Sequence, residues 1–454
     1  MSWRRHLWWY GFRWAAKLRL AAAAAALLGL AIEKPGKSGS GDGARLLILA
    51  KQGLSEDADS AFGDDPRFVL WHLDMVEIKL FKAMVSAFLP PEIDDYNYIS
   101  DDPAIAADKA AYRAFAKQVM ARLLAKFGFA AVITANFAYY AEREVGAALE
   151  QLGVPFIVLD KEGRKSPGRA EFFREIYRRR RGPFAGRRIL ACNDIEKSIL
   201  LDAGIVTPER LTVTGMPRFD RIHRWRRRVA GRRREGQAPR QVLFFSFSAK
   251  SGLPRIARKL GFGVPGGLEP FADERDDWNW DELLAACHRA AVTLARENPE
   301  IHVVVKSKGT SVEVRAMEAS IAAAGPRPDN LVTVAGGDPL ELILQSDAVF
   351  GFNSTALFEA LAAGKPLVVP RFAEAGNATL QPHIIDLEEA AEYAFSEAEL
   401  VDLLRAHAID PAPAPAELPV SHAALLQKWT GNADGCAGQR VAAAVLAEIR
   451  AKHD

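Results

Sequence analysis

The sequence predicts an α/β protein built from two doubly wound domains. Its 454 residues exceed the usual size of a single domain. Short apolar runs alternate with helical stretches, a pattern typical of parallel strands joined by helices and buried on both faces. The alternation occurs twice, before and after a strongly basic tract at 221–240. We therefore expect one parallel sheet on each side of that tract.

Each expected strand is a short apolar run bounded by polar residues or glycine. In the N-terminal half these runs cover 46–50, 68–70, 131–134, 156–159, 189–192 and 211–213. In the C-terminal half they cover 242–247, 302–306, 331–334, 348–352 and 367–369. Expected helices include 109–127, 140–152, 281–297, 312–324, 339–345 and 356–363, and a last helix reaches Ile449. Ligands of such sheets bind at the carboxyl ends of strands, so the loops after strands carry the candidate site residues.

The N-terminal segment, residues 1–34, differs from the rest in composition. Its first 20 residues hold six aromatic and five basic side chains, and an uncharged run follows at 20–32. That run is shorter than the ~20 residues of a membrane-spanning helix. Aromatic and basic side chains favour the headgroup zone of an anionic bilayer. We expect an interfacial helix that attaches a cytoplasmic protein peripherally to the inner membrane, and removal of this segment is expected to leave a folded protein.

Two nucleotide-binding patterns in the chain lack the context that their chemistry needs. Residues 31–38 end in Gly-Lys-Ser, but an Ala-rich helix precedes them and a Gly/Ser linker follows. Residues 261–266 spell G-x-G-x-x-G without a preceding strand, so we expect a loop there. The three cysteines are too far apart for a disulfide framework or a thiolate zinc site. We expect no bound metal, since Asp57-Ala-Asp59 is predicted to lie in a loop beyond the first strand.

Charge is distributed unevenly along the chain. The net charge is +2, yet residues 164–240 hold 22 Lys/Arg against 8 Asp/Glu. Such polarity indicates contact with something anionic. Arg178–Arg181 and Arg221–Arg234 are candidates for binding lipid phosphate or an anionic acceptor chain. No recognition motif supports nucleic acid as the partner.

The most informative segment runs from Asp347 to Pro370. An expected strand ends at Phe352, and Asn353, Ser354 and Thr355 then offer capping groups at the start of a helix. A helix N-terminus directly after a parallel strand favours anions. Glu359 lies about one turn further on, where its carboxylate could accept hydrogen bonds from ribose hydroxyls. A plain N-cap followed by a buried glutamate explains the same residues equally well.

This segment resembles the donor-nucleotide element of GT-B glycosyltransferases, with Ser354, Glu359-Ala360 and Gly364-Lys365-Pro366 in the matching positions. Val213-Thr-Gly-Met-Pro-Arg-Phe-Asp220 resembles the V-x-G-x-P-R-x-D element of capsule and surface polysaccharide transferases. The resemblance covers the chain from about Arg45 to its end. It implies a GT-B-like fold in which two Rossmann-like domains face a cleft. The implied divisions are a membrane-interacting helix (1–34), a linker (35–43), an acceptor domain (44–225), a nucleotide-donor domain (226–430) and a terminal helix returning to the N-terminal domain (431–454).

The activity implied by the resemblance is transfer of a sugar from a nucleotide-activated donor to a polysaccharide or lipid-linked acceptor, without a cofactor. Two alternatives remain open on the same fold, a CDP-polyol phosphotransferase and a sugar-nucleotide epimerase. A third is a non-catalytic subunit of polysaccharide assembly. The membrane-binding segment counts against an epimerase, since that reaction needs no membrane.

The resemblance also points to residues outside the donor element. Relatives often carry Lys-x-His-Pro where this chain reads Lys306-Ser-Lys308-Gly, so a cationic pair replaces a candidate histidine. A general base is needed to deprotonate an acceptor hydroxyl in an inverting transferase, and Glu162 is preferred over Asp160 for that role. The remaining candidates are Ser248, Lys250 and Arg218 for phosphate and Asn136 and Arg143 for the acceptor side.

Overall fold

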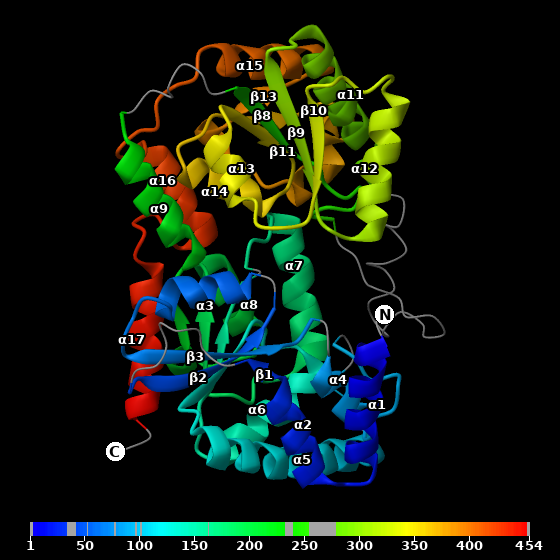
Figure 1. Cartoon of the computed structure of the whole chain (residues 1–454), viewed down its shortest axis with the longest axis vertical. Helices are drawn as coiled ribbons and strands as arrows, with labels where there is room; N and C mark the ends of the chain where they lie inside the picture. The colour runs from blue at the N-terminus through cyan, green and yellow to red at the C-terminus, as the bar shows by residue number, and fades with distance from the viewer. Residues whose placement is uncertain are drawn as a thin grey trace.

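The computed structural model describes residues 3–33, 42–51, 53–76, 79–95, 98–99, 102–161, 163–231, 239–253 and 278–451. Within these ranges the chain forms two parallel sheets, each covered by helices, stacked one above the other in Figure 1. The prediction of two doubly wound domains is confirmed, and the architecture is GT-B-like.

The N-terminal sheet has the strand order β1-β3-β2-β4-β5-β6-β7, in which only β1 runs antiparallel to its neighbour. Alternate residues of β2 are buried on opposite faces, with Leu46 and Ile48 on one side and Leu47 and Leu49 on the other. A strand that is apolar on both faces must be covered twice, which requires helices on both sides. The strands are β1 (Ile32–Glu33), β2 (Ala44–Ala50), β3 (Phe68–Asp74), β4 (Ala131–Thr134), β5 (Phe156–Leu159), β6 (Arg188–Ala191) and β7 (Leu211–Val213).

Helices of this domain follow the strands in order. They are α3 (Leu54–Phe62), α4 (Leu80–Val85), α5 (Pro103–Phe127), α6 (Tyr140–Gln151), α7 (Pro167–Ile176) and α8 (Asp194–Asp202), with a π-helical turn, η2 (Tyr177–Arg181), and a 3-10 turn, η3 (Pro208–Arg210). Asp102 caps α5 and Asn193 caps α8 with their side chains. The last helix, α17 (Ala437–Arg450), packs with α3 against the Leu46 face of the sheet.

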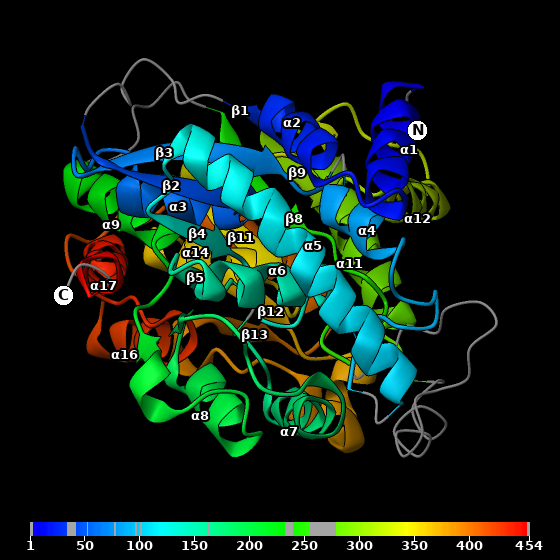
Figure 2. The same ribbon diagram turned by 90° about the horizontal axis from the view of Figure 1, so that it is seen from below.

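The N-terminal segment forms two helices rather than one, α1 (Trp3–Lys17) and α2 (Ala21–Ala31). Figure 2 shows both lying beside α4 and α5. Phe12 and Leu28 are fully buried in the N-terminal core, and β1 extends the sheet after α2. The expectation of a dispensable segment is therefore wrong in physical terms, because its removal would expose this part of the core. None of the helices in the described ranges has the length and apolar composition that crossing a membrane requires.

The C-terminal sheet is parallel throughout, in the order β10-β9-β8-β11-β12-β13. Its strands are β8 (Arg240–Phe245), β9 (Ile301–Ser307), β10 (Leu331–Ala335), β11 (Ala348–Gly351), β12 (Leu367–Pro370) and β13 (Glu392–Ala394). The rings of Phe244 and Phe350 stack between adjacent strands, with centroids 4.3 Å apart. The helices are α11 (Asp281–Glu297), α12 (Ser311–Ala323), α13 (Leu340–Gln345), α14 (Thr355–Ala362), α15 (Glu397–Ile409) and α16 (Val420–Thr430), with 3-10 turns η4 (Ala373–Gly376), η5 (Ala378–His383) and η6 (Glu388–Ala390).

The chain passes between the domains twice, and the two crossings touch. Gly215 and Gly431 both have positive φ, 84° and 62°. A Cβ on Gly215 would lie 2.3 Å from the Gly431 carbonyl oxygen, and a Cβ on Gly431 would lie 2.1 Å from the Cys192 carbonyl oxygen. Only glycine permits this approach at these backbone angles.

Asp220 fastens the two crossings together. Its carboxylate is buried and accepts hydrogen bonds from the backbone amides of Ala437 (3.1 Å) and Gly438 (2.8 Å), at the N-terminus of α17. It also accepts one from the Asn432 side chain at 2.6 Å, and that amide donates to the Met216 carbonyl at 2.8 Å. Burial raises the pKa of Asp220, and these donors oppose the rise.

The basic tract begins as helix α9 (Arg218–Val229), and several of its arginines bind the protein itself. Arg226 is buried and donates to the Ala362 carbonyl of α14 at 2.7 Å. Arg221 forms an ion pair with Asp338 at 2.8 Å, and Arg227 donates to the Asp434 carbonyl. The Arg178–Arg181 group lies in η2, where Arg178 and Arg179 pair with Glu175. Part of the positive charge that suggested an anionic surface is thus used in holding the fold.

We predict that Asp220→Ala destabilises the protein by about 3 kcal/mol, because several buried donors lose a charged acceptor. Thermal unfolding should show a lower midpoint for this variant. Asp410→Ala, which removes an exposed carboxylate after α15, is the control. Its free energy of unfolding should stay within about 0.5 kcal/mol of the wild-type value. Equal midpoints for the two variants would contradict the role of Asp220.

Candidate functional site

The C-terminal half of the site lies at the carboxyl ends of β8 and β11, where the strand order reverses. Ser354 is the N-cap of α14, and its hydroxyl accepts a hydrogen bond from the Ala356 amide at 3.3 Å. Thr355 is the first residue of that helix. The predicted strand-to-helix junction is present, and the positive end of α14 is placed at the switch point.

Asn353 serves a different purpose from the one its position suggested. It adopts a left-handed conformation, with φ of 48°. Its amide group donates to the carbonyls of Ser251 (3.2 Å) and His383 (3.0 Å), and its Oδ1 accepts from the Ile385 amide at 2.8 Å. The side chain therefore joins three loops and has its hydrogen bonds directed into the protein.

Glu359 lies one turn into α14 and is 7% exposed. Among the described residues, no hydrogen bond or ion pair is made by its carboxylate. Burial raises the pKa of Glu359, while the charges of Arg218 and Arg164 oppose the rise. A buried carboxylate without donors is costly unless a ligand supplies them. Hydroxyl groups of a ligand would be suitable donors to this carboxylate.

The two lysines predicted to act as a pair, Lys306 and Lys308, lie in different environments. Lys306 is 6% exposed and donates to the Gly336 carbonyl, and burial lowers its pKa. Lys308 is exposed at the start of the following loop. Lys306 also lies within electrostatic reach of Glu359, so of the two it is the one placed at the switch point.

The loop after β8 is tied to its neighbours. The Ser248 hydroxyl accepts a hydrogen bond from the Lys250 amide at 3.3 Å, and the Lys250 ammonium donates to the Trp278 carbonyl at 2.6 Å. Ser246 shares a 3.2 Å hydrogen bond with His288, whose pKa burial lowers to about 4. These hydrogen bonds fix the conformation of the loop, and Ser248 is half-buried within it.

On the N-terminal side, Arg218 is held by Asp57, for which we predicted no role in the site. Asp57, fully buried in α3, accepts from the Arg218 backbone amide (2.9 Å), Nε (3.1 Å) and Nη2 (2.8 Å). The expected loop around Asp57 is thus a helix, and its carboxylate orients a guanidinium. Gly53, with φ of 82°, makes room for it, because a Cβ there would lie 2.9 Å from Arg218 Nη1.

Two further features of the N-terminal half, Arg164 and the contact between Lys51 and Glu142, were not predicted from the sequence. Arg164, after β5, is half-buried near Arg218. Lys51, directly after β2, contacts the buried Glu142 carboxylate, which also accepts from Thr134 at the end of β4. Burial lowers the pKa of Lys51, and Glu142 opposes that change. The Lys51–Glu142 contact joins residues 91 positions apart, so no local pattern could have revealed it.

The remaining candidates fall outside this cluster or outside the described residues. Glu162, the preferred base, lies outside the described ranges. Asp160 is buried, and the Cys192 thiol approaches it at 3.5 Å. The Asn136 side chain accepts from the Ala138 amide in a local turn. Arg143 is buried, donates to the Pro183 carbonyl at 2.7 Å and stacks on the Tyr98 ring, so it supports the domain from within.

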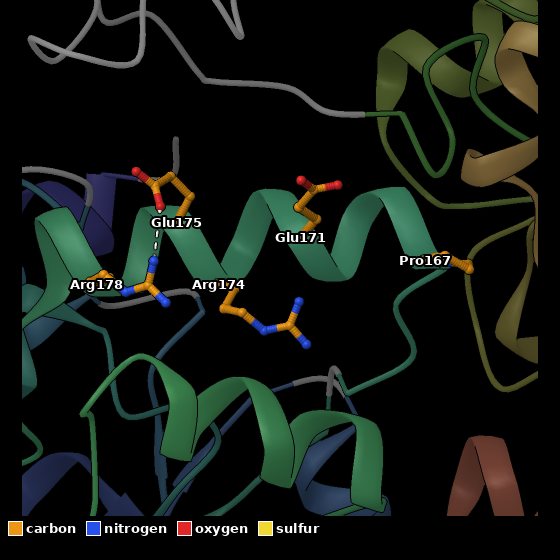
Figure 3. A pocket seen from close by; sticks show the side chains of 5 residues that line it. All are labelled: Pro167, Glu171, Arg174, Glu175 and Arg178. Carbon is orange, nitrogen blue, oxygen red and sulfur yellow. Dashed lines mark hydrogen bonds and ion pairs between the residues drawn. The ribbon is translucent and has the colours of Figure 1, made fainter.

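A separate cavity of about 480 Å³ lies along α7 and is shown in Figure 3. It is lined by Pro167, Glu171, Arg174, Glu175 and Arg178. Arg178 pairs with Glu175 one turn away on the same helical segment, and Arg174 pairs with Asp202 of α8. Of the candidate residues, Arg178 lines this cavity. Within the described ranges, no group of three His, Cys, Asp or Glu side chains is arranged to hold a metal ion.

No protein-family model matches the chain, and no curated protein matches it either. Among solved structures, it is similar to UDP-GlcNAc 2-epimerase from Neisseria meningitidis bound to UDP-GlcNAc, at 10% identity and a TM-score of 0.47, covering 89% of this chain and 100% of that one. The wall teichoic acid polymerase TagF is similar at 9% identity and a TM-score of 0.46 over 100% of both chains. MurG of Acinetobacter baumannii has 13% identity and a TM-score of 0.41, over 89% of this chain and 99% of the other.

We predict that Glu359→Gln does not lower the thermal midpoint near neutral pH. Folding raises the pKa of this carboxyl above its ordinary value of 4.5, so its ionised form is disfavoured in the folded state. The wild type therefore loses stability as the pH rises through this range, and the glutamine variant lacks that loss. The midpoint of the variant minus that of the wild type should increase from pH 4 to pH 8.

The control is Glu300→Gln, which changes an exposed carboxylate between α11 and β9. Its midpoint should follow that of the wild type at each pH. A loss of stability in Glu359→Gln at pH 8 would mean that the carboxylate has a structural partner, and the assignment to a ligand would be withdrawn.

Proposed function

We propose that the protein is a glycosyltransferase that uses a nucleotide-activated sugar to build capsule or other surface polysaccharide. The observation that carries the proposal is the buried Glu359 carboxylate, which lies one turn beyond the α14 N-terminus and accepts no hydrogen bond from the described residues. A nucleotide supplies both complementary groups, since its ribose hydroxyls donate hydrogen bonds and its phosphates are anionic.

In this proposal the donor binds the C-terminal domain. Its phosphates lie near Ser354 and Thr355, where the helix dipole and backbone amides favour negative charge. Lys306 neutralises part of the charge that develops on the leaving nucleotide. Asn353 acts indirectly, by holding the loops after β8 and β11 in place.

The acceptor is proposed to approach from the N-terminal domain. Glu162 remains the proposed base, and Asp160 is the less favourable choice because its carboxylate is buried beside the Cys192 thiol. A CDP-polyol phosphotransferase, an epimerase or a non-catalytic subunit would show itself in product analysis. Incubation with nucleotide-sugars, with and without acceptor, distinguishes transfer from epimerisation, which needs no acceptor.

We also propose that α1 attaches the protein to the cytoplasmic face of the inner membrane. Leu7, Tyr10 and Trp14 share one face of this helix, Leu18 follows its last residue, and all four are exposed by 50–65%, while Phe12 on the opposite face is buried. Arg13 and Lys17 are exposed beside that face. An apolar stripe flanked by basic side chains suits the interface of an anionic bilayer.

We predict that a nucleoside diphosphate stabilises the protein against heat. At 100 times its Kd a ligand stabilises by about 2.7 kcal/mol, and screening CMP, CDP, UDP, GDP and ADP identifies the base. The double variant Ser354→Ala/Thr355→Ala should lose about tenfold in affinity, or ~1.4 kcal/mol. Ser396→Ala removes the comparable cap of α15 and is the control for capping itself. If none of the five nucleotides stabilises the wild type, the proposed function fails.

We predict that replacing Leu7, Tyr10, Trp14 and Leu18 together by serine abolishes flotation with anionic liposomes and leaves the thermal midpoint nearly unchanged. The control carries Val312→Ser and Val420→Ser, which change exposed apolar residues of the C-terminal domain. Added salt should weaken wild-type flotation only in part, because the apolar contact resists salt. If the fourfold serine variant floats as well as the control, α1 does not make the membrane contact. The arginine groups of η2 and α9 would then be the next candidates.

A further inference from the structure

Arg164 forms no ion pair with a carboxylate of the residues that the structure describes. It follows β5, is half-buried and lies within electrostatic reach of Arg218 in α9 and Glu359 in α14. The hydrogen bond that its guanidinium makes within the described residues goes to the Met216 sulfur, at 3.3 Å. A thioether is a weak acceptor and carries no charge. No ion pair with a described carboxylate is present.

A second guanidinium, that of Arg218, lies close enough for its positive charge to disfavour the charged form of Arg164. Burial lowers the pKa of Arg164 to about 10, and the charge of Arg218 adds to the effect. Asp57 binds Arg218 through two side-chain nitrogens and one backbone amide, so this carboxylate is already occupied. The structure therefore holds two neighbouring guanidinium groups and one bonded carboxylate.

Glu359 belongs to the C-terminal domain and lies within electrostatic reach of both arginines. Its charge acts on Arg164 and on Arg218, yet no ion pair joins it to them. Among the described residues, the Glu359 carboxylate accepts no hydrogen bond and the Arg164 guanidinium forms no ion pair, although each lies within electrostatic reach of the other. A ligand that is anionic and carries hydroxyl groups would complement both groups.

We propose that Arg164 binds a phosphoryl group of the nucleotide-activated donor from the N-terminal side and so completes an anion site shared by both domains. This inference rests on the proposed function, because it assumes that Glu359 and the α14 N-terminus hold the nucleotide. The planar guanidinium presents parallel N–H donors that match two phosphate oxygens. Arg218, oriented by Asp57, adds its remaining Nη1 to the same side.

The test uses the full chain and compares Arg164→Met with the wild type. The nucleotides are CDP, UDP, GDP and ADP, with the matching nucleoside and inorganic pyrophosphate as separate probes, measured by calorimetry and thermal shift. We expect the methionine variant to bind the preferred nucleoside diphosphate at least tenfold more weakly, to lose its response to pyrophosphate and to keep its affinity for the nucleoside. Glu359→Gln should instead weaken the nucleoside and the diphosphate alike.

Arg174→Met is the matched control, because Arg174 lies on α7 and pairs with Asp202. It should bind every probe as the wild type does. If the wild type binds a nucleoside diphosphate and Arg164→Met binds it equally well, the inference is overturned and the proposed function stands. If the wild type binds none of the nucleotides, the proposed function itself fails.

Arg164→Lys guards against misfolding of the methionine variant. It keeps the charge and loses the planar pair of donors, so we expect diphosphate affinity between those of wild type and Arg164→Met. Wild-type affinity in the folded lysine variant would show that charge alone suffices and would overturn the bidentate contact.

Discussion

The contact between the two interdomain crossings is the constraint on which the site depends. Gly215 and Gly431 allow the two segments to touch, and Asp220 and Asn432 bind them together. The same short segment from Gly215 to Asp220 carries Arg218 onto Asp57. A shift at the crossing would therefore move Arg218 relative to Glu359. The V-x-G-x-P-R-x-D pattern is explained by this geometry, in which each polar residue has a definite structural partner.

Much of the fold followed from the sequence because the signals for it are local. Buried parallel strands are short apolar runs, so β4 (Ala131–Thr134), β5 (Phe156–Leu159) and β7 (Leu211–Val213) could be predicted to the residue. The strand-to-helix junction at Ser354 was predictable for the same reason, since a cap and the helix that it begins are adjacent in sequence. The short strands β1 and β13 were missed, because each depends on a neighbour that supplies its pairing.

The residues that the sequence could not reveal are those whose partners lie far away. Asp57 is separated from Arg218 by 161 positions, and Lys51 from Glu142 by 91. Composition alone also misled in the N-terminal segment, where Phe12 and Leu28 have the character of membrane anchors but pack into the core. Asn353 and Arg143 were reasonable candidates by type, yet both side chains direct their hydrogen bonds into the protein.

The arginines between residues 164 and 240 differ in the partners that the fold gives them. The excess of arginine at 164–240 predicted an anionic partner, and an exposed basic surface would be the simplest form of it. The structure instead uses Arg221 and Arg226 to join α9 to the C-terminal domain, and Arg218 to join the start of α9 to α3 of the N-terminal domain. Arg164 differs from these three because its neighbour is a thioether. An anion that fills this position would meet a site already oriented by the surrounding ion pairs, so little reorganisation would oppose its binding.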